Sequence, residues 1–353
     1  MGYREEGMSL KRSDEIPSIA FFYAKPYDQE FFDEANQNYG FSIRYLKAHL
    51  NQETAYLSKG HQVVCVSVND CVDQKILELL LGENVKLLAL RSSGYNHVDL
   101  KGAYKHIPVV RVPDYSPYSI AEHTVGLMLC LNRKMHKAHQ RVLSNNFSIE
   151  GLLGFDMHGK TVGIIGLGKI GKAVAQILKG MGMRILVYDI NPDQDFSRKL
   201  GIELVELNDL YQESHVITLH CPLTSESQHL INRKAFDKMQ KGVMIINTGR
   251  GGLIHTTDLL YSLKNGKVGA AGLDVYENER SYFHENLSNT FVSDDILARL
   301  MTFPNVLITS HQAFFTRESL KNIAATTLKN IQEFCTNKPL KNEVKWSSKD
   351  PSP

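Results

Sequence analysis

The sequence predicts an α/β protein built on two doubly wound parallel sheets. Short apolar runs alternate with amphipathic stretches along most of the 353 residues, which is typical of βαβ units. The alternation starts afresh at Thr161. The length also suits two domains better than one or four, at about 100–200 residues per domain.

The first series predicts four strands with helices between them. The apolar runs are Ile19–Tyr23, Val63–Val66, Val85–Leu90 and Val109–Val112. A helix is expected at Asp73–Leu81, between the second and third runs. After Pro113 and Pro117, apolar residues recur at helical spacing, so one long helix is expected from Ser119 to about Val142.

The second series predicts six strands and leaves a short C-terminal remnant. The strands are Thr161–Ile165, Arg184–Tyr188, His215–Leu219, Val243–Asn247, Val268–Leu273 and Val306–Thr309. Only 353 − 309 = 44 residues follow, which suit one helix, roughly Arg317 to Cys335, and a polar tail. Because that remnant is too small for a domain, we expect it to pack on the first domain. The expected domains are 1–116 with 315–353, and 117–314.

Composition and charge exclude several classes of protein. Hydrophobic residues make up 42% and charged residues 22%, an ordinary globular mix. The net charge is 40 − 38 = +2, so no basic excess favours a nucleic-acid or membrane partner. Five scattered cysteines without a C-x-x-C pair fit a reducing compartment. No apolar run could span a bilayer, and the charged, polar segment Met1–Pro17 is no secretory signal. We therefore expect a cytoplasmic protein with a frayed leader.

The sharpest local motif is a glycine fingerprint, whose glycines are Gly166, Gly168 and Gly171. A bare G-x-G-x-x-G is weak, but here an apolar strand precedes it and an apolar-periodic helix follows. The next strand ends at Asp189, 18 residues after Gly171, close to the spacing of about 20 expected for an acid that binds the adenosine ribose. An acid there repels a 2′-phosphate, so the motif predicts NAD rather than NADP. An ordinary glycine-rich βα turn is the less favoured alternative.

Chemically active side chains follow three later strands. Arg250 lies just after Val243–Asn247, three acids follow Val268–Leu273, and His311 follows Val306–Thr309. The acids are Asp274, Glu277 and Glu279. Arginine pairs with a carboxylate through two parallel hydrogen bonds, and a histidine oriented by a carboxylate exchanges a proton near neutral pH. The set suits hydride transfer between a nicotinamide and a 2-keto or 2-hydroxy acid. Each residue alone has a plain alternative as a solvated or salt-bridged loop residue.

These motifs, in this order, resemble the NAD-dependent D-2-hydroxyacid dehydrogenases, and within them the bacterial fermentative D-lactate dehydrogenases. The resemblance runs from about Ile19 to about Lys338. It depends on the fingerprint and on seven further segments, which are 90–96, 112–117, 121–124, 220–224, 247–251, 272–280 and 311–314. Such proteins have two Rossmann- or flavodoxin-like domains with a cleft between them, and pair through the cofactor domain. The resemblance therefore implies a homodimer or homotetramer acting on a small molecule.

Matching positions imply roles for individual residues. Arg250, Glu279 and His311 match the catalytic residues, and Glu277 matches a neighbouring acid that is not catalytic. Ser93 and Gly94 match a loop whose backbone N–H groups hold the substrate carboxylate, and Tyr115 matches a tyrosine near the substrate. The matches to cofactor-binding positions, NAD being the cofactor, are Gly166, Gly168, Lys169, Ile170, Gly171, Asp189, Cys221, Pro222, Asn247, Thr248 and Asp274. Asp274 matches the acid that meets the nicotinamide amide.

Some alternatives stay open. Gly249 stands where the family usually has serine, and Ser92 and Ser93 stand where small apolar residues are commoner, so the substrate is less defined than the reaction class. The leading expectation is reduction of pyruvate to D-lactate by NADH. A bulkier 2-keto acid is the second expectation, and an NADH-sensing regulator on the same fold is the third. No metal site is expected, because His136 and His139 have no third ligand nearby in sequence.

Overall fold

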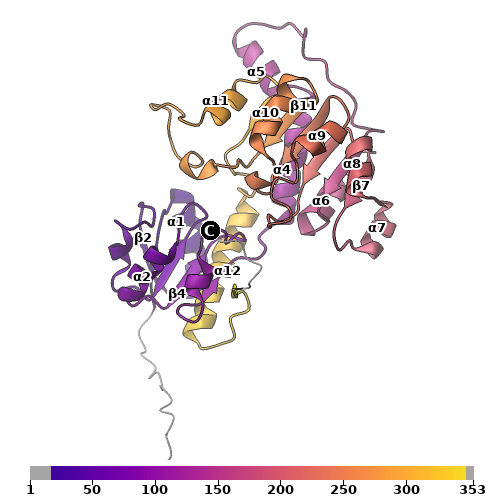
Figure 1. Cartoon of the computed structure of the whole chain (residues 1–353). Helices are drawn as coiled ribbons and strands as arrows, with labels where there is room; N and C mark the ends of the chain where they lie inside the picture. Colours follow the sequence, from indigo (N-terminus) through magenta and orange to yellow (C-terminus); the bar gives the residue numbers. More distant parts are fainter. Residues whose placement is uncertain (1–16, 347–353) are drawn as a thin grey trace, which may run out of the picture. The chain divides into compact units, whose positions relative to one another are not determined.

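The computed structural model describes residues 17–346 (Figure 1). The expected frayed leader, apart from Pro17, and the last seven residues of the polar tail lie outside the described residues. The described chain divides into two compact units. The first comprises residues 17–114 and 320–346, and the second comprises residues 115–319.

The first unit is a five-stranded parallel sheet in the order β2-β1-β3-β4-β5. The strands are β1 (Ser18–Phe21), β2 (Ser42–Tyr45), β3 (Val63–Val66), β4 (Leu87–Leu90) and β5 (Val109–Val110). The helices are α1 (Pro26–Asn36), α2 (Gln74–Gly82), α3 (Leu100–Ala103), the short 3₁₀ turn η1 (Ala55–Ser58) and most of α12 (Arg317–Cys335). Every residue of β3 and β4 is buried, as expected for central parallel strands covered on both faces. The half-exposed edge strand β2 has no continuous apolar run, and the sequence did not predict it.

The second unit is a seven-stranded parallel sheet in the order β12-β11-β10-β9-β6-β7-β8. Its strands are β6 (Thr161–Ile165), β7 (Arg184–Tyr188), β8 (Glu203–Leu204), β9 (Val216–Leu219), β10 (Val243–Asn247), β11 (Val268–Leu273) and β12 (Val306–Ile308). The chain runs outward from β6 in one direction through β7 and β8, and from β9 in the other. The strand order therefore reverses between β6 and β9, which is where open α/β sheets bind ligands.

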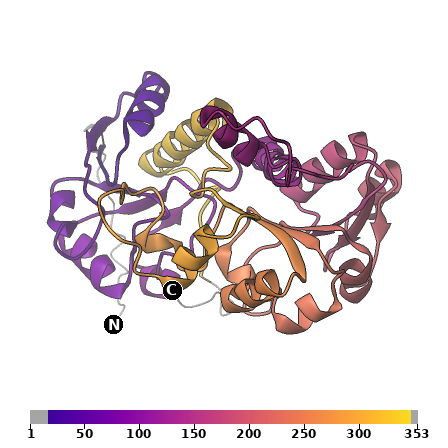
Figure 2. The same ribbon diagram turned by 90° about the horizontal axis from the view of Figure 1, so that it is seen from above.

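Helices cover both faces of this second sheet (Figure 2). One face packs against α4 (Pro117–Asn132), α6 (Lys169–Gly180) and α7 (Gln194–Leu200). The other packs against α8 (Leu207–Glu213), α9 (Arg233–Lys238), α10 (Thr256–Lys264) and α11 (Asp295–Met301). None of the helices between residues 17 and 346 combines the length and apolar character that crossing a bilayer requires. The two-sheet α/β fold predicted from the sequence is confirmed.

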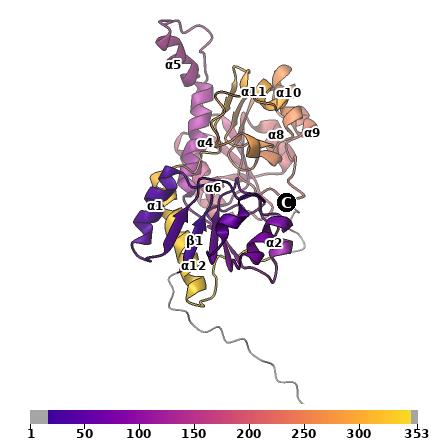
Figure 3. The same cartoon turned by 90° about the vertical axis from the view of Figure 1, so that its left-hand side faces the viewer.

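The single long helix expected from Ser119 to about Val142 is wrong. The structure has two helices, α4 and α5 (Met135–Leu143), separated by Lys134 in the left-handed conformation with φ 49° (Figure 3). The cause is a tertiary contact at Asn132, whose side chain exchanges two hydrogen bonds with the backbone of Phe155, at 2.7 and 2.9 Å. The backbone at Gly154 also approaches the Asn132 carbonyl too closely to leave room for a Cβ. The returning loop thus ends α4, although the helical pattern of the sequence continues.

Close packing of β6 on α8 depends on Gly163, and this gives a stability prediction. A Cβ on this buried glycine would collide with the Ser214 hydroxyl and the Leu210 side chain. We expect Gly163→Ala to destabilise the protein by about 1–3 kcal/mol, since overpacking forces side chains and backbone to shift. The measurement is the urea unfolding midpoint. The control is Gly126→Ala in α4, where a Cβ meets nothing within 4 Å; it should be neutral or slightly stabilising. Equal stability of the two variants would contradict this account of the packing.

Candidate active site

The glycine fingerprint joins β6 to α6 at the point where the strand order reverses. Gly166 has φ 99°, and a Cβ there would lie 2.6 Å from the backbone nitrogen of Cys221. A Cβ on Gly171 would collide with the Gly166 carbonyl, so strand and helix pack closely only without side chains. By contrast, Gly168 at the start of α6 has open space where a Cβ would be. That space, next to helix N–H groups that no side chain caps, suits the pyrophosphate of a dinucleotide.

Asp189 follows β7 and points its carboxylate at the fingerprint. One oxygen accepts a hydrogen bond from the backbone nitrogen of Leu167 (2.5 Å), and the other accepts from Asn191 (2.7 Å). The acid therefore lies beside the glycine loop, where a ribose hydroxyl would find an acceptor. These observations show that the residues fit a dinucleotide.

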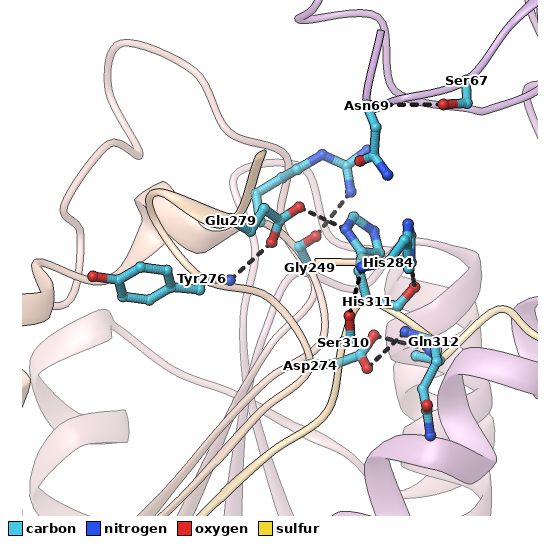
Figure 4. Close-up of polar contacts among 12 residues, drawn as sticks. Ser67, Asn69, Gly249, Asp274, Tyr276, Glu279, His284, Ser310, His311 and Gln312 are labelled. Carbon is cyan, nitrogen blue, oxygen red and sulfur yellow. Dashed lines mark hydrogen bonds and ion pairs between the residues drawn. The ribbon is translucent and has the colours of Figure 1, made fainter. Parts of the chain in front are cut away.

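His311 and Glu279, from different loops, meet in a short contact. The Nδ1 atom of His311 lies 2.6 Å from Oε1 of Glu279, and both side chains are about one-fifth exposed (Figure 4). An ionised carboxylate only accepts hydrogen bonds, so Nδ1 carries a proton in both states of the ring. The other ring nitrogen, Nε2, is the atom that gains and loses a proton. The second oxygen of Glu279 accepts a hydrogen bond from the backbone nitrogen of Tyr276 (2.8 Å). Both carboxylate oxygens therefore have a partner, which fixes the orientation of the side chain.

Asp274 is fully buried and organises the backbone on both sides of His311. Its carboxylate accepts from the backbone nitrogens of Gln312 and Ala313 (both 2.9 Å) and from the Thr309 hydroxyl (2.5 Å). Its own carbonyl accepts from the His311 backbone nitrogen (2.7 Å). His311 itself has φ 48°, an uncommon conformation for a residue other than glycine. Burial alone would raise the pKa of Asp274, but donors from His123, Thr309, Ala313 and Gln312 outweigh it and lower the pKa.

Arg250 lies between β10 and the 3₁₀ turn η2 (Gly251–Leu253). Its carbonyl accepts a hydrogen bond from the Asn247 side chain (2.9 Å), and its Nη1 donates to the Gly249 carbonyl (2.8 Å). A Cβ on Gly251 would collide with the backbone of Tyr276 and Glu277. The turn carrying Arg250 is therefore pressed directly against the segment that carries Glu279.

The structure also locates the other residues singled out from the sequence. Most of them follow the carboxyl ends of strands in the second sheet: Lys169 and Ile170 after β6, Cys221 and Pro222 after β9, Asn247 and Thr248 at β10, and Asp274 after β11. Tyr115 is in the same unit, with its ring 6.0 Å from that of Phe314. Ser93 and Gly94 belong to the first unit, where they follow β4 and the Ser93 carbonyl accepts from Arg111 (2.7 Å). The residues of the second unit thus share one sheet edge.

Two histidines near His311 were not singled out from the sequence as site residues. His123 on α4 places Nε2 3.1 Å from the Thr309 hydroxyl and 3.4 Å from Asp274. His284 places its Nε2 3.3 Å from the His311 carbonyl (Figure 4), and burial together with the neighbouring His311 lowers its pKa. His123 lies in segment 121–124, one of the segments on which the family resemblance depends, so that motif could have identified it as a site residue. No pattern in the sequence marks His284. Within the described chain, no group of three potential ligands could hold a metal ion.

Comparisons with known proteins agree with this geometry. Residues 125–313 match the family model described as D-isomer specific 2-hydroxyacid dehydrogenase, NAD binding domain. A 2-hydroxyacid dehydrogenase homolog of Haemophilus influenzae is 51% identical over 92% of this chain and 98% of that protein. The structure of apo D-lactate dehydrogenase from Escherichia coli is 45% identical with a TM-score of 0.85, covering 93% of this chain and 99% of that one. A pyruvate reductase structure from Chlamydomonas reinhardtii is 40% identical with a TM-score of 0.88, covering 92% and 98%.

The buried carboxylate of Asp274 gives a prediction for stability against pH. Because its folded pKa is lowered, its contribution should be complete above the unfolded value of about 3.9 and lost as pH falls through the folded pKa. Asp274→Asn removes the charge and turns an N–H group toward other donors, so we expect a loss of about 1–3 kcal/mol at pH 7. Urea unfolding of both proteins from pH 7 to pH 3 measures the difference, which should shrink in acid.

The control for this prediction is Asp195→Asn, at an aspartate that is 79% exposed and 3.5 Å from Arg198. That change should cost no more than about 0.5 kcal/mol. An Asp274→Asn protein as stable as the wild type at pH 7 would show that the buried carboxylate does not organise this loop.

Proposed function

Because the chain belongs to the D-isomer specific 2-hydroxyacid dehydrogenase family, we propose that this NAD-dependent enzyme reduces pyruvate to D-lactate. The observation that carries the proposal is the contact between His311 and Glu279, which leaves Nε2 of the imidazole as the proton-transfer atom. Hydride transfer to a ketone creates an alkoxide, and a protonated imidazole is a suitable acid for it near neutral pH.

In this proposal His311 and Glu279 act as a pair. In reduction, Nε2 of the imidazolium donates its proton to the oxygen on C2, and the Glu279 carboxylate stabilises the imidazolium and fixes the orientation of the ring. In oxidation of the hydroxy acid, neutral Nε2 takes the hydroxyl proton. The left-handed backbone of His311, held by Asp274, directs the ring before substrate binds. Less reorientation is then needed at the moment of reaction.

Arg250 supplies the second part of the proposed chemistry. Its planar guanidinium pairs with the substrate carboxylate and polarises the keto oxygen, which lysine cannot do with the same geometry. Backbone N–H groups at Ser93 and Gly94 are proposed to bind the substrate carboxylate, and Tyr115 to lie near the substrate. We assign substrate holding to residues 1–116 with 315–353.

The NAD-binding residues are proposed to lie in residues 117–314, a range that includes the matched NAD binding domain. Gly166, Gly168 and Gly171 leave room for the pyrophosphate beside α6, and Lys169 and Ile170 begin that helix. Asp189 accepts from the ribose hydroxyls. Bound NADH supplies the hydride that C2 of the keto acid receives. The remaining proposed contacts are Cys221, Pro222, Asn247, Thr248 and Asp274.

Pyruvate is proposed as substrate on two grounds. The Escherichia coli and Chlamydomonas relatives are named a D-lactate dehydrogenase and a pyruvate reductase, and each covers more than nine-tenths of this chain. The segment after His311 also carries Phe314, whose ring packs edge-on with Tyr115, and bulky rings there favour a small substituent on the keto acid. A bulkier 2-keto acid is the alternative.

We also propose that the protein is a homodimer or homotetramer assembled through residues 135–155, here called the α5 arm. No residue of α5 is buried, and Phe147, Ile149 and Leu153 are 73%, 83% and 88% exposed. The arm nevertheless has internal order, because Lys134 and Arg141 donate to backbone carbonyls of Gly151 and Glu150 (2.8 and 2.7 Å). An ordered apolar surface of this kind is typical of a protein interface, and a second copy is the occupant we propose.

The five cysteines are free, which supports a cytoplasmic location.

Substrate choice tests the proposed reaction. Purified protein should oxidise NADH with pyruvate at the highest kcat/KM in a panel that includes 2-ketobutyrate, 2-ketoisocaproate, hydroxypyruvate and glyoxylate, and the product should be D-lactate. One additional methylene costs only about 1–3 kcal/mol, so 2-ketobutyrate should still react. Faster turnover of 2-ketoisocaproate would overturn pyruvate as the substrate and leave family membership intact.

The Glu279–His311 pair predicts the pH dependence. Reduction needs protonated His311, so its rate should decline along an alkaline limb, and Glu279→Gln should move that limb to lower pH because the stabilising charge is lost. Each pH unit by which the limb moves corresponds to about 1.4 kcal/mol of lost interaction free energy between residue 279 and the protonated ring. The measurement is kcat/KM for reduction from pH 5 to pH 10. Glu277→Gln, two residues away, should leave the limb in place, and equal movement in the two variants would remove support for Glu279 as the partner.

The α5 arm predicts the oligomeric state. Wild-type protein at micromolar concentration should sediment as a dimer or tetramer, and Phe147→Asp combined with Leu153→Asp should produce monomers, because charges would then be buried in the interface. The control is Met301→Glu on α11, an apolar side chain that is 58% exposed and outside the arm. A monomeric wild type, or a double variant that still assembles, would contradict the proposal.

A further inference from the structure

Glu277 lies two residues before Glu279, and its carboxylate joins three elements of the second unit. Oε1 lies 2.5 Å from Nε2 of His229, on the loop after β9. Oε2 accepts from the Thr256 hydroxyl (2.7 Å) and from the Thr256 backbone nitrogen (3.3 Å) at the start of α10. Only about a quarter of the carboxylate side chain is exposed. Glu277 is therefore held by two side chains and a backbone nitrogen, although part of it meets solvent.

The contact with Thr256 caps α10 from outside the helix. The residue before α10, His255, makes no side-chain capping hydrogen bond. The first N–H groups of a helix need acceptors, and a negative charge at that end is favourable. Glu277 supplies both from a loop after β11. Burial tends to raise the pKa of Glu277, but Thr256 and His229 outweigh it and lower the pKa, so the group is charged at neutral pH.

His229 belongs to a segment that supports the turn carrying Arg250. Its backbone nitrogen donates to the Gly252 carbonyl (2.8 Å), and Ile231 donates to Leu253 (3.0 Å). The His255 backbone nitrogen donates back to Ile231 (2.9 Å). Residues 229–231 thus run alongside residues 252–255 in a short parallel pairing. Holding His229 in place therefore holds the turn that begins at Arg250.

The same turn touches the Glu279 segment directly. Gly251 packs on the backbone of Tyr276 and Glu277 with no room for a Cβ. Tyr276 in turn donates its backbone N–H to Glu279 (2.8 Å). A shift of residues 276–277 would consequently displace Glu279 on one side and the Arg250 turn on the other.

We propose that Glu277 and His229 form a positioning pair that fixes the segment of Glu279 against the turn of Arg250. The inference rests on the proposed roles of Arg250, Glu279 and His311. Neither member of the pair touches substrate; each acts through the backbone it anchors. The other titratable groups facing the pair are His255, whose ring centroid lies 4.8 Å from that of His229, and Asp258, 2.8 Å from His255.

The test uses the full-length protein, NADH and the best keto acid of the panel. Glu277→Ala removes the cap and the His229 contact together. We expect kcat/KM for reduction to fall about 10- to 100-fold, since small misplacements of catalytic groups have effects of that size. The alkaline limb should move part of the way that Glu279→Gln moves it, and the KM of the keto acid should rise. Glu277→Gln keeps the shape, and its amide oxygen can still accept from Thr256, so the limb should lie closer to its wild-type position than in Glu277→Ala.

The matched control is Asp73→Ala, which removes a carboxylate cap from α2, a helix of nine residues like α10. Both changes should lower Tm by about 1–3 °C, because a lost cap costs about 0.5–2 kcal/mol and the unfolding entropy is about 2.1 cal/mol/K per residue. Only Glu277→Ala should move the limb and KM. If Glu277→Ala does not fold, His229→Phe gives the same test, with His229→Gln as its conservative partner, because the glutamine amide reaches the position of Nε2.

The outcomes separate this inference from the proposed function. If Glu279→Gln moves the limb while Glu277→Ala and His229→Phe leave both limb and KM unchanged, the positioning pair is overturned and the catalytic assignment stands. If Asp73→Ala moves the limb as far as Glu277→Ala does, general destabilisation explains the effect and the pair is again overturned. If Glu279→Gln leaves the limb in place, the catalytic assignment fails and the inference fails with it.

Discussion

One buried charge, the carboxylate of Asp274, determines how the candidate site is built. An ionised group without solvent needs several donors, and in this fold the donors are backbone N–H groups of Gln312 and Ala313 and the Thr309 hydroxyl. Meeting that need draws the loop after β12 onto the end of β11 and holds His311 in a left-handed conformation. The loop that carries the His311 ring is therefore held by a buried carboxylate whose pKa is lowered by its donors.

The ionisable neighbours of His311 contact two different parts of it, the imidazole ring and the backbone of its loop. Glu279 contacts Nδ1 of the ring, whereas His284 lies beside the backbone carbonyl of His311, and burial together with the neighbouring His311 lowers the pKa of His284. On the other side, His123 reaches the Asp274 cluster through Thr309. A carboxylate thus acts on the ring directly, while two further histidines act on the loop that carries it.

Close backbone packing is the second constraint on the second unit. Gly171 beside Gly166, and Gly251 beside Tyr276, bring segments together at distances that exclude any side chain. The first contact leaves the start of α6 open at Gly168, and the second joins the Arg250 turn to the Glu279 segment. The Glu277–His229 contact and the cap on α10 lie beside that second junction, where the His229 backbone also bonds to η2. Arg250, Glu279 and His311, which follow three different strands, then lie on loops at one edge of the sheet.

The sequence alone determined the alternation of strands and helices, the position of the glycine fingerprint and the acid that follows it. Those features depend on local patterns, because apolar spacing and the shape of glycine are properties of nearby residues. Several features were decided only by tertiary contacts. Asn132 ends α4 through a loop more than twenty residues away, Glu277 caps a helix that begins twenty-one residues earlier, and His284 meets His311 across a loop. The physical reason is that each of these side chains bonds to groups that only folding brings near it. The spacing of residues along the sequence does not determine which groups those are.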